Sequence, residues 1–583
     1  MTAAADVVGT GNATAGSGRV SRLAMFQPVM LVWLVLAAIL VFLIVAPMEE
    51  LVVSSFEQEG TGAFTLDNYA TAYSKPRYVQ ALWNTLKMGA AVVALALVFA
   101  VPLAWACART DMPGRGLVRL ALLGSFISPP YLSAIGWILL AGPNAGWINK
   151  AWTWLSGDPT RIVNVFTFEG LVFVMASNVF FLIYIFTYSA FEMVNSEMED
   201  SANILGAGPM RTAMRVTFPL IMPSILGSAI ITFLISIALY GVPALISIPA
   251  RYPVIVIQLS EFFGNTPIQL EVAAAYSIPL LLITAALLGL QRLVLARRGY
   301  TSVTGKGAER RIVKLGAWRW VVFAYAMIVA AITLVMPMVV LFAAAFSKIW
   351  TSGLTWANFT FGNFYHIIFE HSTAQKAITT SLGVGAAAAS VAIVLALGIA
   401  YIVQRRVLPF GSALAFLCMA PFVVPGIVLA IGFFAAYAPP PLALYGGFTI
   451  LILAFITRFL PVAYTASAAG IKAIHPEMEE AVRSLGGGRL TAIRYVVGPL
   501  LKRTLFGGWL LIFIPAAQEL STAIFLVGPK TRLVSVLVLD MSEEGRYEHL
   551  AALGCILLVI LSLVVWAGFK IAGRDFMLKR DAA

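Results

Sequence analysis

The chain has 583 residues, of which 60% are hydrophobic and 11% are charged, and its mean hydropathy is +0.90. Soluble domains carry about 25% charged residues, so this composition excludes a soluble enzyme. The formal net charge of +12 would suggest nucleic acid as a partner of a soluble protein, whereas in a membrane protein it indicates where the basic loops lie.

Long apolar runs predict about twelve membrane-crossing helices, because one crossing takes about 20 apolar residues. The runs are too long for a transmembrane β-barrel, whose shorter strands alternate apolar and polar residues. We therefore expect an all-α polytopic membrane protein. In chain order the predicted spans are 29–47, 83–108, 117–141, 169–192, 218–247, 273–295, 318–346, 380–403, 411–436, 444–468, 505–527 and 548–572.

The spans divide into two repeats of six. The first apolar run is about 20 residues long, which favours an uncleaved anchor over a signal peptide. Basic residues gather on the side of the N-terminus, so the positive-inside rule predicts that both termini are cytoplasmic. The expected organisation is a disordered cytoplasmic tail (1–24), a first repeat (25–298), a basic cytoplasmic linker (299–317), a second repeat (318–575) and a second cytoplasmic tail (576–583).

Self-comparison supports the two repeats. Residues 104–136 match the second half at an offset of 296, with Arg109 meeting Arg405 and Pro129 meeting Pro425. Residues 197–220 match at an offset of 280. Six spans is an even number, so both repeats start on the same side and run in parallel. We expect the two matched prolines to kink the third span of each repeat.

The strictest similarity lies in a polar cytoplasmic loop between the fourth and fifth spans of each repeat. The two copies read EMEDSANILGAGPMRTAMRVTFPL and EMEEAVRSLGGGRLTAIRYVVGPL. Acidic residues suit a helix start, and Gly206 or Gly486 suits a left-handed C-cap. A second amphipathic stretch then ends at Pro219 or Pro499, which predicts a surface elbow of two short helices.

Two interpretations of these elbows are open. Each elbow can simply tie two spans together while lying among lipid headgroups. Two copies at matched positions favour instead a contact surface for a two-fold partner.

Both loops resemble the EAA signature of bacterial ABC-importer permeases, Glu-Ala-Ala followed at fixed spacing by Gly, Ile, Leu and Pro. The first copy departs from the usual residue types at Asp200 and Ser201, and the second at Gly498, while both keep the spacing. The resemblance implies a type I permease fold in which each elbow is a coupling helix seated on an ATPase. The implied coupling residues are Glu199, Asp200, Ala202 and Gly206 in loop 193–219, and Glu479, Glu480, Ala481 and Gly486 in loop 470–499.

The ATPases are expected to be separate subunits, because the chain has no GxxxxGK[ST] phosphate-binding loop. The resemblance implies two copies of that ATPase, which hold ATP and Mg, and a periplasmic or extracellular substrate-binding protein. The chain itself is then a transport subunit of the bacterial inner membrane, with no catalytic residue, cofactor, metal or nucleic-acid partner.

Two segments resemble the fused permeases of the ferric-iron type. They are YGVPALISIPARYPVI in the first repeat and the stretch that follows Glu519 in the second. Iron(III) is therefore the leading expectation for the substrate, with thiamine or a phosphonate such as 2-aminoethylphosphonate as alternatives. A secondary transporter driven by an ion gradient is the alternative class, since such proteins also contain six-plus-six repeats.

Two formal charges fall inside predicted spans, where a buried charge is a functional candidate. Glu519 is either a pathway or gate residue, or a structural carboxylate that pairs with Arg458 or caps a broken helix. Arg458 precedes Pro461 and is expected to brace a kink. The further pathway or gate candidates are Tyr240, Pro243, Ser521 and Thr522.

The remaining chemically distinctive residues favour structural roles. Cys107, Cys418 and Cys555 fall in or beside apolar runs and are expected to pack as small hydrophobes. An outer set can be read as an iron site, but we expect solvated loop charges or rim contacts instead. That set is His366, His371, Asp540, Glu543, Glu544 and Glu548.

Overall fold

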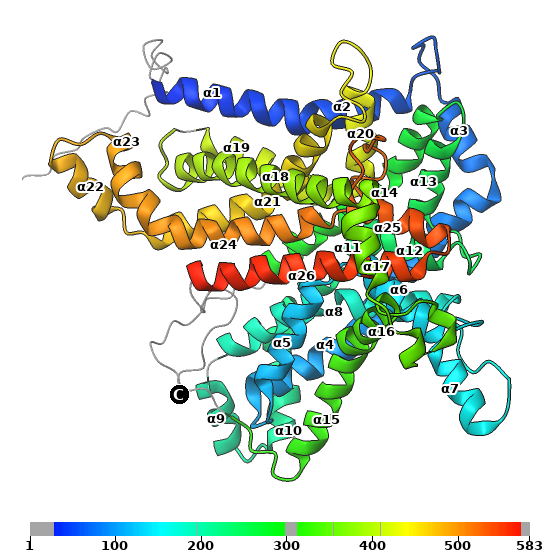
Figure 1. Ribbon diagram of the computed structural model, residues 1–583. Coiled ribbons are helices and arrows are strands. Elements are labelled where there is room, and N and C mark those ends of the chain that lie inside the picture. The colour runs from blue at the N-terminus through cyan, green and yellow to red at the C-terminus, as the bar shows by residue number, and fades with distance from the viewer. Residues whose placement is uncertain (1–27, 195, 298–311, 354, 409, 573–583) are drawn as a thin grey trace, which may run out of the picture.

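The computed structural model describes residues 28–194, 196–297, 312–353, 355–408 and 410–572 (Figure 1). Within these ranges the chain forms α-helices joined by π-helical and 3-10 turns, with no strand, and the predicted all-α fold is confirmed. Both predicted tails and residues 299–311 of the predicted linker lie outside the described residues.

In the described residues of the first half the chain forms fourteen α-helices. They are α1 (Pro28–Leu40), α2 (Ala46–Ser55), α3 (Asp67–Ser74), α4 (Pro76–Arg109), α5 (Arg115–Ile127), α6 (Pro130–Ala141), α7 (Trp147–Ser156), α8 (Phe168–Met193), α9 (Ser196–Ile204), α10 (Pro209–Thr212), α11 (Phe218–Ala238), α12 (Gly241–Ile246), α13 (Ile255–Gly264) and α14 (Leu270–Arg297).

The second half repeats this plan. Its helices are α15 (Trp318–Ala330), α16 (Met336–Ala345), α17 (Gly362–Tyr365), α18 (Ser372–Gln404), α19 (Gly411–Met419), α20 (Gly426–Tyr437), α21 (Phe448–Ala473), α22 (Glu477–Ser484), α23 (Arg489–Ala492), α24 (Gly498–Ala517), α25 (Val534–Glu543) and α26 (Tyr547–Ala572).

Ten helices of the described residues are long and apolar enough to cross a membrane, and two bent pairs bring the number to twelve. The α5–α6 pair bends by 104° and the α19–α20 pair by 111°. The breaks fall at Pro129 and Pro425, so the predicted kinks are confirmed.

Each bent pair makes one crossing. Arg109 at the end of α4 bonds to Glu199, which lies just beyond the end of α8, so α4 and α8 end on the same side. The chain leaves α4 on that side and must return to the opposite side to begin α8. Of the three helices between them, α7 has only ten residues, so the α5–α6 pair must make that crossing, and α19–α20 occupies the same place in the second half.

The first span of each half packs on the other half. Trp33 of α1 donates its indole N–H to the Phe410 carbonyl over 3.3 Å. Tyr325 of α15 donates its hydroxyl to the Val98 carbonyl in α4 over 2.6 Å. In Figure 1, α1 accordingly runs beside α19, and α15 lies beside α5. This exchange ties the two sequence repeats into one body.

Two equivalent glycines mark the closest contacts of this exchange. A Cβ atom at Gly136 would lie 2.4 Å from the carbonyl oxygen of Pro337, and one at Gly432 would lie 2.5 Å from that of Pro47. Small residues allow backbones to touch where helices cross in a membrane. One continuous core contains most of the buried apolar side chains of both halves, and Cys107, Cys418 and Cys555 are buried in it as expected.

Two predicted spans need correction at their outer ends. In the predicted spans 218–247 and 505–527, the crossing helices already end at Ala238 and Ala517. Beyond these points the chain stays apolar but forms short helices and turns that are buried in protein. Hydropathy cannot distinguish such a segment from a crossing helix, because irregular backbone is tolerated at membrane depth when other helices cover it.

Candidate functional site

The two predicted elbows are present at one end of the molecule, which we call the cytoplasmic end following the charge-based prediction. In the first, α9 is followed by Gly206, whose φ is +83°. The Ala207 N–H donates to the Ala202 carbonyl over 3.0 Å and so closes a glycine C-cap. In Figure 1, α9 and α10 lie at the lower left.

The second elbow has the same geometry. Gly486 follows α22 with a φ of +83°, and the Gly487 N–H donates to the Val482 carbonyl over 2.9 Å. Only glycine adopts this left-handed conformation without a steric penalty. The matched glycines therefore set the same turn in both loops.

One expectation about the elbows is wrong. The second stretch of each elbow does not end at Pro219 or Pro499 but continues into the next crossing helix through a π-helical turn, Ala213–Thr217 or Ile493–Val497. The Phe218 N–H bonds five residues back to Ala213, which widens the helix just before the proline. A proline ring would otherwise press on the carbonyl four residues earlier. Each elbow is thus rigidly joined to a crossing helix.

A buried ion pair supports the base of the first elbow. Glu199 lies 3.4 Å from Nη1 of Arg109 and accepts a hydrogen bond from the Thr217 hydroxyl over 2.7 Å. Arg109 also donates to the Val194 carbonyl over 2.8 Å. The carboxylate and guanidinium side chains are only 8% and 3% exposed. The pair thereby links the end of α4 to the first turn of α9.

The second elbow repeats this arrangement. Arg405 donates from Nε to Glu479 over 2.7 Å and from Nη2 to the Ile474 carbonyl over 3.0 Å. Tyr401 donates its hydroxyl to the other Glu479 oxygen over 2.7 Å. Glu199 and Glu479 therefore face the permease interior, where they can position the elbow but cannot lie on its outer surface.

The outward face of the elbows carries both polar and apolar side chains. Asp200, Glu480 and Ala481 are exposed, and Ala202 is partly buried. Leu205 and Leu485, directly before the two glycines, are 87% and 90% exposed. Large apolar side chains this exposed are candidate contact residues for another protein or for lipid. We call the exposed residues of α9 and α22, with Leu205 and Leu485, the elbow surface.

The predicted pathway residues meet where the two halves touch, beyond the ends of α11 and α24. The Tyr240 N–H donates to the Ser521 hydroxyl over 3.3 Å. A Cβ atom at Gly241 would lie 3.0 Å from Leu520. Pro243 is buried within α12. The structure thus brings equivalent segments of the two repeats together at this point.

Glu519 is partly buried and caps a turn. Its Oε1 accepts the N–H of Thr522 over 3.0 Å, and Ser535 donates its hydroxyl to the Glu519 carbonyl over 2.8 Å. Of the two structural roles considered for Glu519, the observed hydrogen bond therefore agrees with capping. The predicted pairing with Arg458 is not formed, because that guanidinium donates to the Val424 carbonyl over 2.8 Å at the break between α19 and α20.

Tyr131 is a polar residue of this region that sequence reasoning missed. Its hydroxyl is buried and has no hydrogen-bond partner among the described residues, and its Cβ packs beside Gly241. The Thr522 hydroxyl is likewise buried without a described partner. A tyrosine in a predicted span carries no charge signal, so only the fold reveals it. We call Tyr131, Tyr240, Glu519, Ser521 and Thr522 the central polar cluster.

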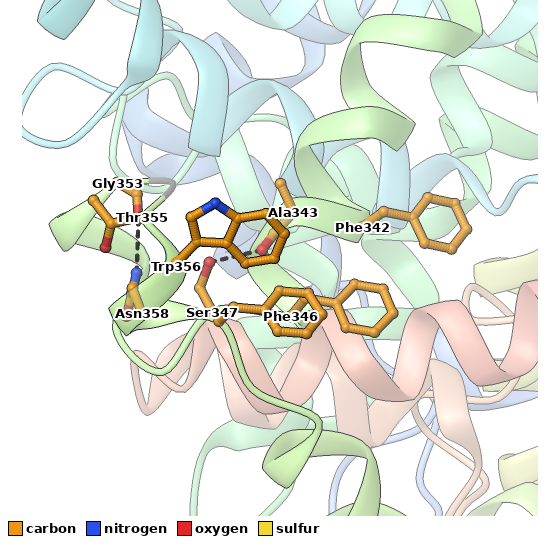
Figure 2. A pocket seen from close by; sticks show the side chains of 9 residues that line it. Phe342, Ala343, Phe346, Ser347, Gly353, Thr355, Trp356 and Asn358 are labelled. Carbon is orange, nitrogen blue, oxygen red and sulfur yellow. Dashed lines mark hydrogen bonds between the residues drawn. The ribbon is translucent and has the colours of Figure 1, made fainter.

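The outer loop after α16 contains a cavity of about 350 Å³ that aromatic side chains line (Figure 2). Ser347 donates its hydroxyl to the Ala343 carbonyl, and Asn358 donates its amide to the Gly353 carbonyl, each over 2.7 Å. Both polar side chains therefore already donate hydrogen bonds to backbone carbonyls of the same segment. In the part of the chain that the structure describes, no three His, Cys, Asp or Glu side chains are placed to hold a metal.

Comparison with known proteins gives relatives over nearly the whole chain, although no protein-family model matches it. The ferric transport system permease protein FbpB of Actinobacillus pleuropneumoniae is 25% identical over 550 residues, which are 90% of this chain and 75% of the relative. The probable ABC transporter permease protein y4fN of Sinorhizobium fredii is 23% identical over 553 residues, 91% of this chain and 93% of the relative.

A third relative matches one half only. The spermidine/putrescine transport system permease protein PotC of Escherichia coli is 27% identical over 245 residues, 42% of this chain and 90% of the relative. Nearly the whole of that relative thus matches less than half of this chain.

The duplicated elbows, the twelve crossings and these similarities define a multi-pass permease of the ABC-importer class. Within that class the chain is a fused two-repeat permease, with the whole-chain layout of the ferric transport permeases that it resembles. It is a transport subunit.

Proposed function

We propose that the chain forms the path by which iron(III), delivered by a binding protein, crosses a bacterial inner membrane. The observation that carries the proposal is the pair of elbows, each clamped by a buried Arg–Glu pair and each continuous with a crossing helix. Such an arrangement can transmit a push at Leu205 or Leu485 into the bilayer. The assignment of iron(III) as the substrate rests on the two ferric transport relatives that match 85% or more of the chain.

The mechanism is alternating access driven by separate ATPase subunits. Two copies of the ATPase dock on the elbow surface, and their closure on ATP and Mg moves both elbows together. Because α10 and α23 run through π-helical turns into α11 and α24, the elbows turn these helices as rigid bodies. The halves then rock about the contact between Tyr240 and Ser521, and the chain itself needs no cofactor.

Reconstitution tests the proposal. The full chain is placed in proteoliposomes with its ATPase, and iron(III)-loaded binding protein is supplied outside. We expect iron uptake that requires ATP and that thiamine or 2-aminoethylphosphonate does not compete. Uptake driven by a proton or sodium gradient without the ATPase would indicate a secondary transporter and overturn the proposal.

A matched pair of variants tests the docking surface. Leu485→Glu places a charge on the elbow surface without disturbing the core, since the residue is 90% exposed. We expect it to abolish co-purification of the ATPase while thermal stability stays unchanged. Leu500→Glu, at a residue that is 51% exposed on α24, is the control and should retain the ATPase.

A further inference from the structure

A polar cavity of about 390 Å³ lies at the predicted outer end of the first half, between the start of α4 and the segment joining α12 to α13. Arg77, Gln80 and Arg251 are exposed at its rim. Ser247 and Gln258, each only 2% exposed, also line it and form its floor. Small-molecule sites commonly have volumes of about 300–1,000 Å³, so this one is large enough for a ligand.

The floor presents polar atoms that nothing in the described chain satisfies. Gln258 donates its amide N–H to Glu261, which leaves its carbonyl oxygen Oε1 available. Neither that oxygen nor the Ser247 hydroxyl has a hydrogen-bond partner among the described residues. An unsatisfied buried polar group is unfavourable, so a ligand that donates a hydrogen bond to Oε1 would stabilise the pocket.

The rim carries one positive charge in excess. Arg77 pairs with Glu261 over 2.5 Å, whereas Arg251 makes no ion pair within the ranges the structure describes. Arg251 also has a φ of +52°, a left-handed conformation that is unfavourable for a residue with a Cβ atom. The turn holds it there, since the Tyr252 N–H donates to the Ser247 carbonyl over 3.0 Å. An anionic group is the natural partner for this guanidinium.

The second half shares the backbone of this region. The Ile255 N–H at the start of α13 donates to the Thr85 hydroxyl over 2.9 Å. At the start of α25 the Val534 N–H donates to the Ser381 hydroxyl over the same distance. These anchors establish that α13 and α25 are equivalent, with Ile255 opposite Val534.

The polar floor is not repeated. In this register Gln258 corresponds to Leu537, and Ser247, which directly follows α12, corresponds to Leu526. The second half therefore builds the same backbone with apolar side chains. Since the fold does not require the polar floor, its presence in the first half calls for another reason.

We propose that this pocket binds an anion with a neighbouring hydroxyl, placing the anionic group on Arg251 and the hydroxyl on Oε1 of Gln258. A free hydroxycarboxylate and the headgroup of phosphatidylglycerol both supply that chemistry. The inference goes beyond the transport function and stands whether or not iron is the cargo.

The test uses the full chain in nanodiscs of phosphatidylcholine, with L-malate and succinate as probes. The two acids differ by one hydroxyl, so calorimetric titration should show malate binding about tenfold more tightly, as one added hydrogen bond predicts. Arg251→Gln should weaken both acids about tenfold. Gln258→Leu, which introduces the residue of the second half, should remove only the preference for malate.

The same calorimetric titration is applied to control variants. Arg161→Gln, at an exposed arginine of another outer loop, should change neither affinity. Ser247→Ala serves as a second floor variant should Gln258→Leu melt early. Failure of malate to bind at millimolar concentration, or equal binding of both acids, would overturn the proposal. In phosphatidylglycerol nanodiscs, loss of malate binding identifies the headgroup as the occupant, and retained binding identifies the free acid.

Discussion

Arg405 and Glu479 join the end of α18 to the first turn of α22 through a 2.7 Å hydrogen bond. Arg109 and Glu199 make the corresponding link in the first half, with 3.4 Å between the charged atoms. Both arginines also hold the carbonyl that precedes the elbow. The elbow is therefore fixed to two crossing helices, by the ion pair on one side and by the continuous helix on the other.

Breaking one partner of this pair should uncouple the elbow. Glu479→Ala leaves Arg405 buried without its counter-charge, a change that typically costs about 3–5 kcal/mol. We expect substrate-stimulated ATP hydrolysis to fall at least tenfold and the melting temperature to drop. Glu199→Ala should act in the same direction in the first half.

The double variant Arg405→Met, Glu479→Met distinguishes the destabilisation caused by an unpaired buried charge from the role of the ion pair in positioning the elbow. Replacing both charges with apolar side chains of similar size is often neutral for stability. The melting temperature should recover, while coupling stays impaired because the elbow loses its fixed angle. Full coupling in this double variant would contradict a positioning role for the pair.

The glycine at the elbow corner should tolerate no side chain. Gly486→Ala forces a φ of +83° on a residue with a Cβ atom, at a cost of about 1–2 kcal/mol. The turn should shift and ATP hydrolysis should lose its dependence on loaded binding protein. Gly488→Ala is the matched control, because a Cβ atom there meets nothing within 4 Å and its φ is not left-handed. Equal effects of the two changes would contradict the claim that the left-handed conformation at Gly486 is needed for coupling.

The exchange of first spans should depend on Gly136. An alanine there would place Cβ 2.4 Å from the Pro337 carbonyl oxygen, a contact that the rigid proline backbone cannot relieve. We expect Gly136→Ala to destabilise the permease by several degrees in a thermal melt and to expose the junction of α6 and α16 to protease. Gly289→Ala, with nothing within 4 Å, should leave both measurements unchanged.

Local rules were sufficient to predict the elbows, since an acidic helix start and a left-handed glycine leave a signature within ten residues. The same holds for the breaks at Pro129 and Pro425. The exchange of α1 and α15 between halves has no such signature, because any apolar helix face can pack on another. Hydropathy also predicts continuous helix around Tyr240 and Leu520, because it depends on the apolar character of the side chains and not on the backbone geometry.

The site was predicted only in part. The sequence pattern places Glu199 and Glu479 at the starts of the elbows, but the inward direction of their side chains depends on arginines 90 and 74 positions away. Tyr131 and the floor of the outer pocket depend on contacts between distant elements in the same way. Polar residues that act through long-range contacts cannot be assigned from a local pattern.

Two variants of Glu519 separate its charge from its hydrogen bond. The carboxylate accepts the Thr522 N–H over 3.0 Å, and a glutamine oxygen can accept the same bond. Glu519→Gln should lower iron uptake several-fold if the charge contacts the passing cation, with an unchanged melting temperature. Glu519→Ala also removes the cap and should cost about 1 kcal/mol of stability. Unchanged uptake in Glu519→Gln would assign the residue to structure alone.

His371 should make the outer end of α18 sensitive to pH. Its Nδ1 accepts the Ala374 N–H over 3.0 Å, so the ring caps the helix only while that nitrogen is unprotonated. Burial, and then the neighbouring His366, lower the pKa of His371 below its usual value of 6.5. A lowered pKa in the folded state means that the cap is fully present above pH 6.5 and is lost as the pH falls through the folded value.

Asparagine at position 371 provides the comparison, since it caps helices without titrating. We expect the wild-type chain to lose about 1 kcal/mol relative to His371→Asn between pH 7.5 and pH 5, as measured by thermal or denaturant unfolding. The other charged or ionisable side chains of this cluster, His366, Glu370, Glu544, Arg546 and His549, are present in both proteins. The difference between the two slopes thus isolates His371, and parallel slopes would show that its cap does not respond to pH.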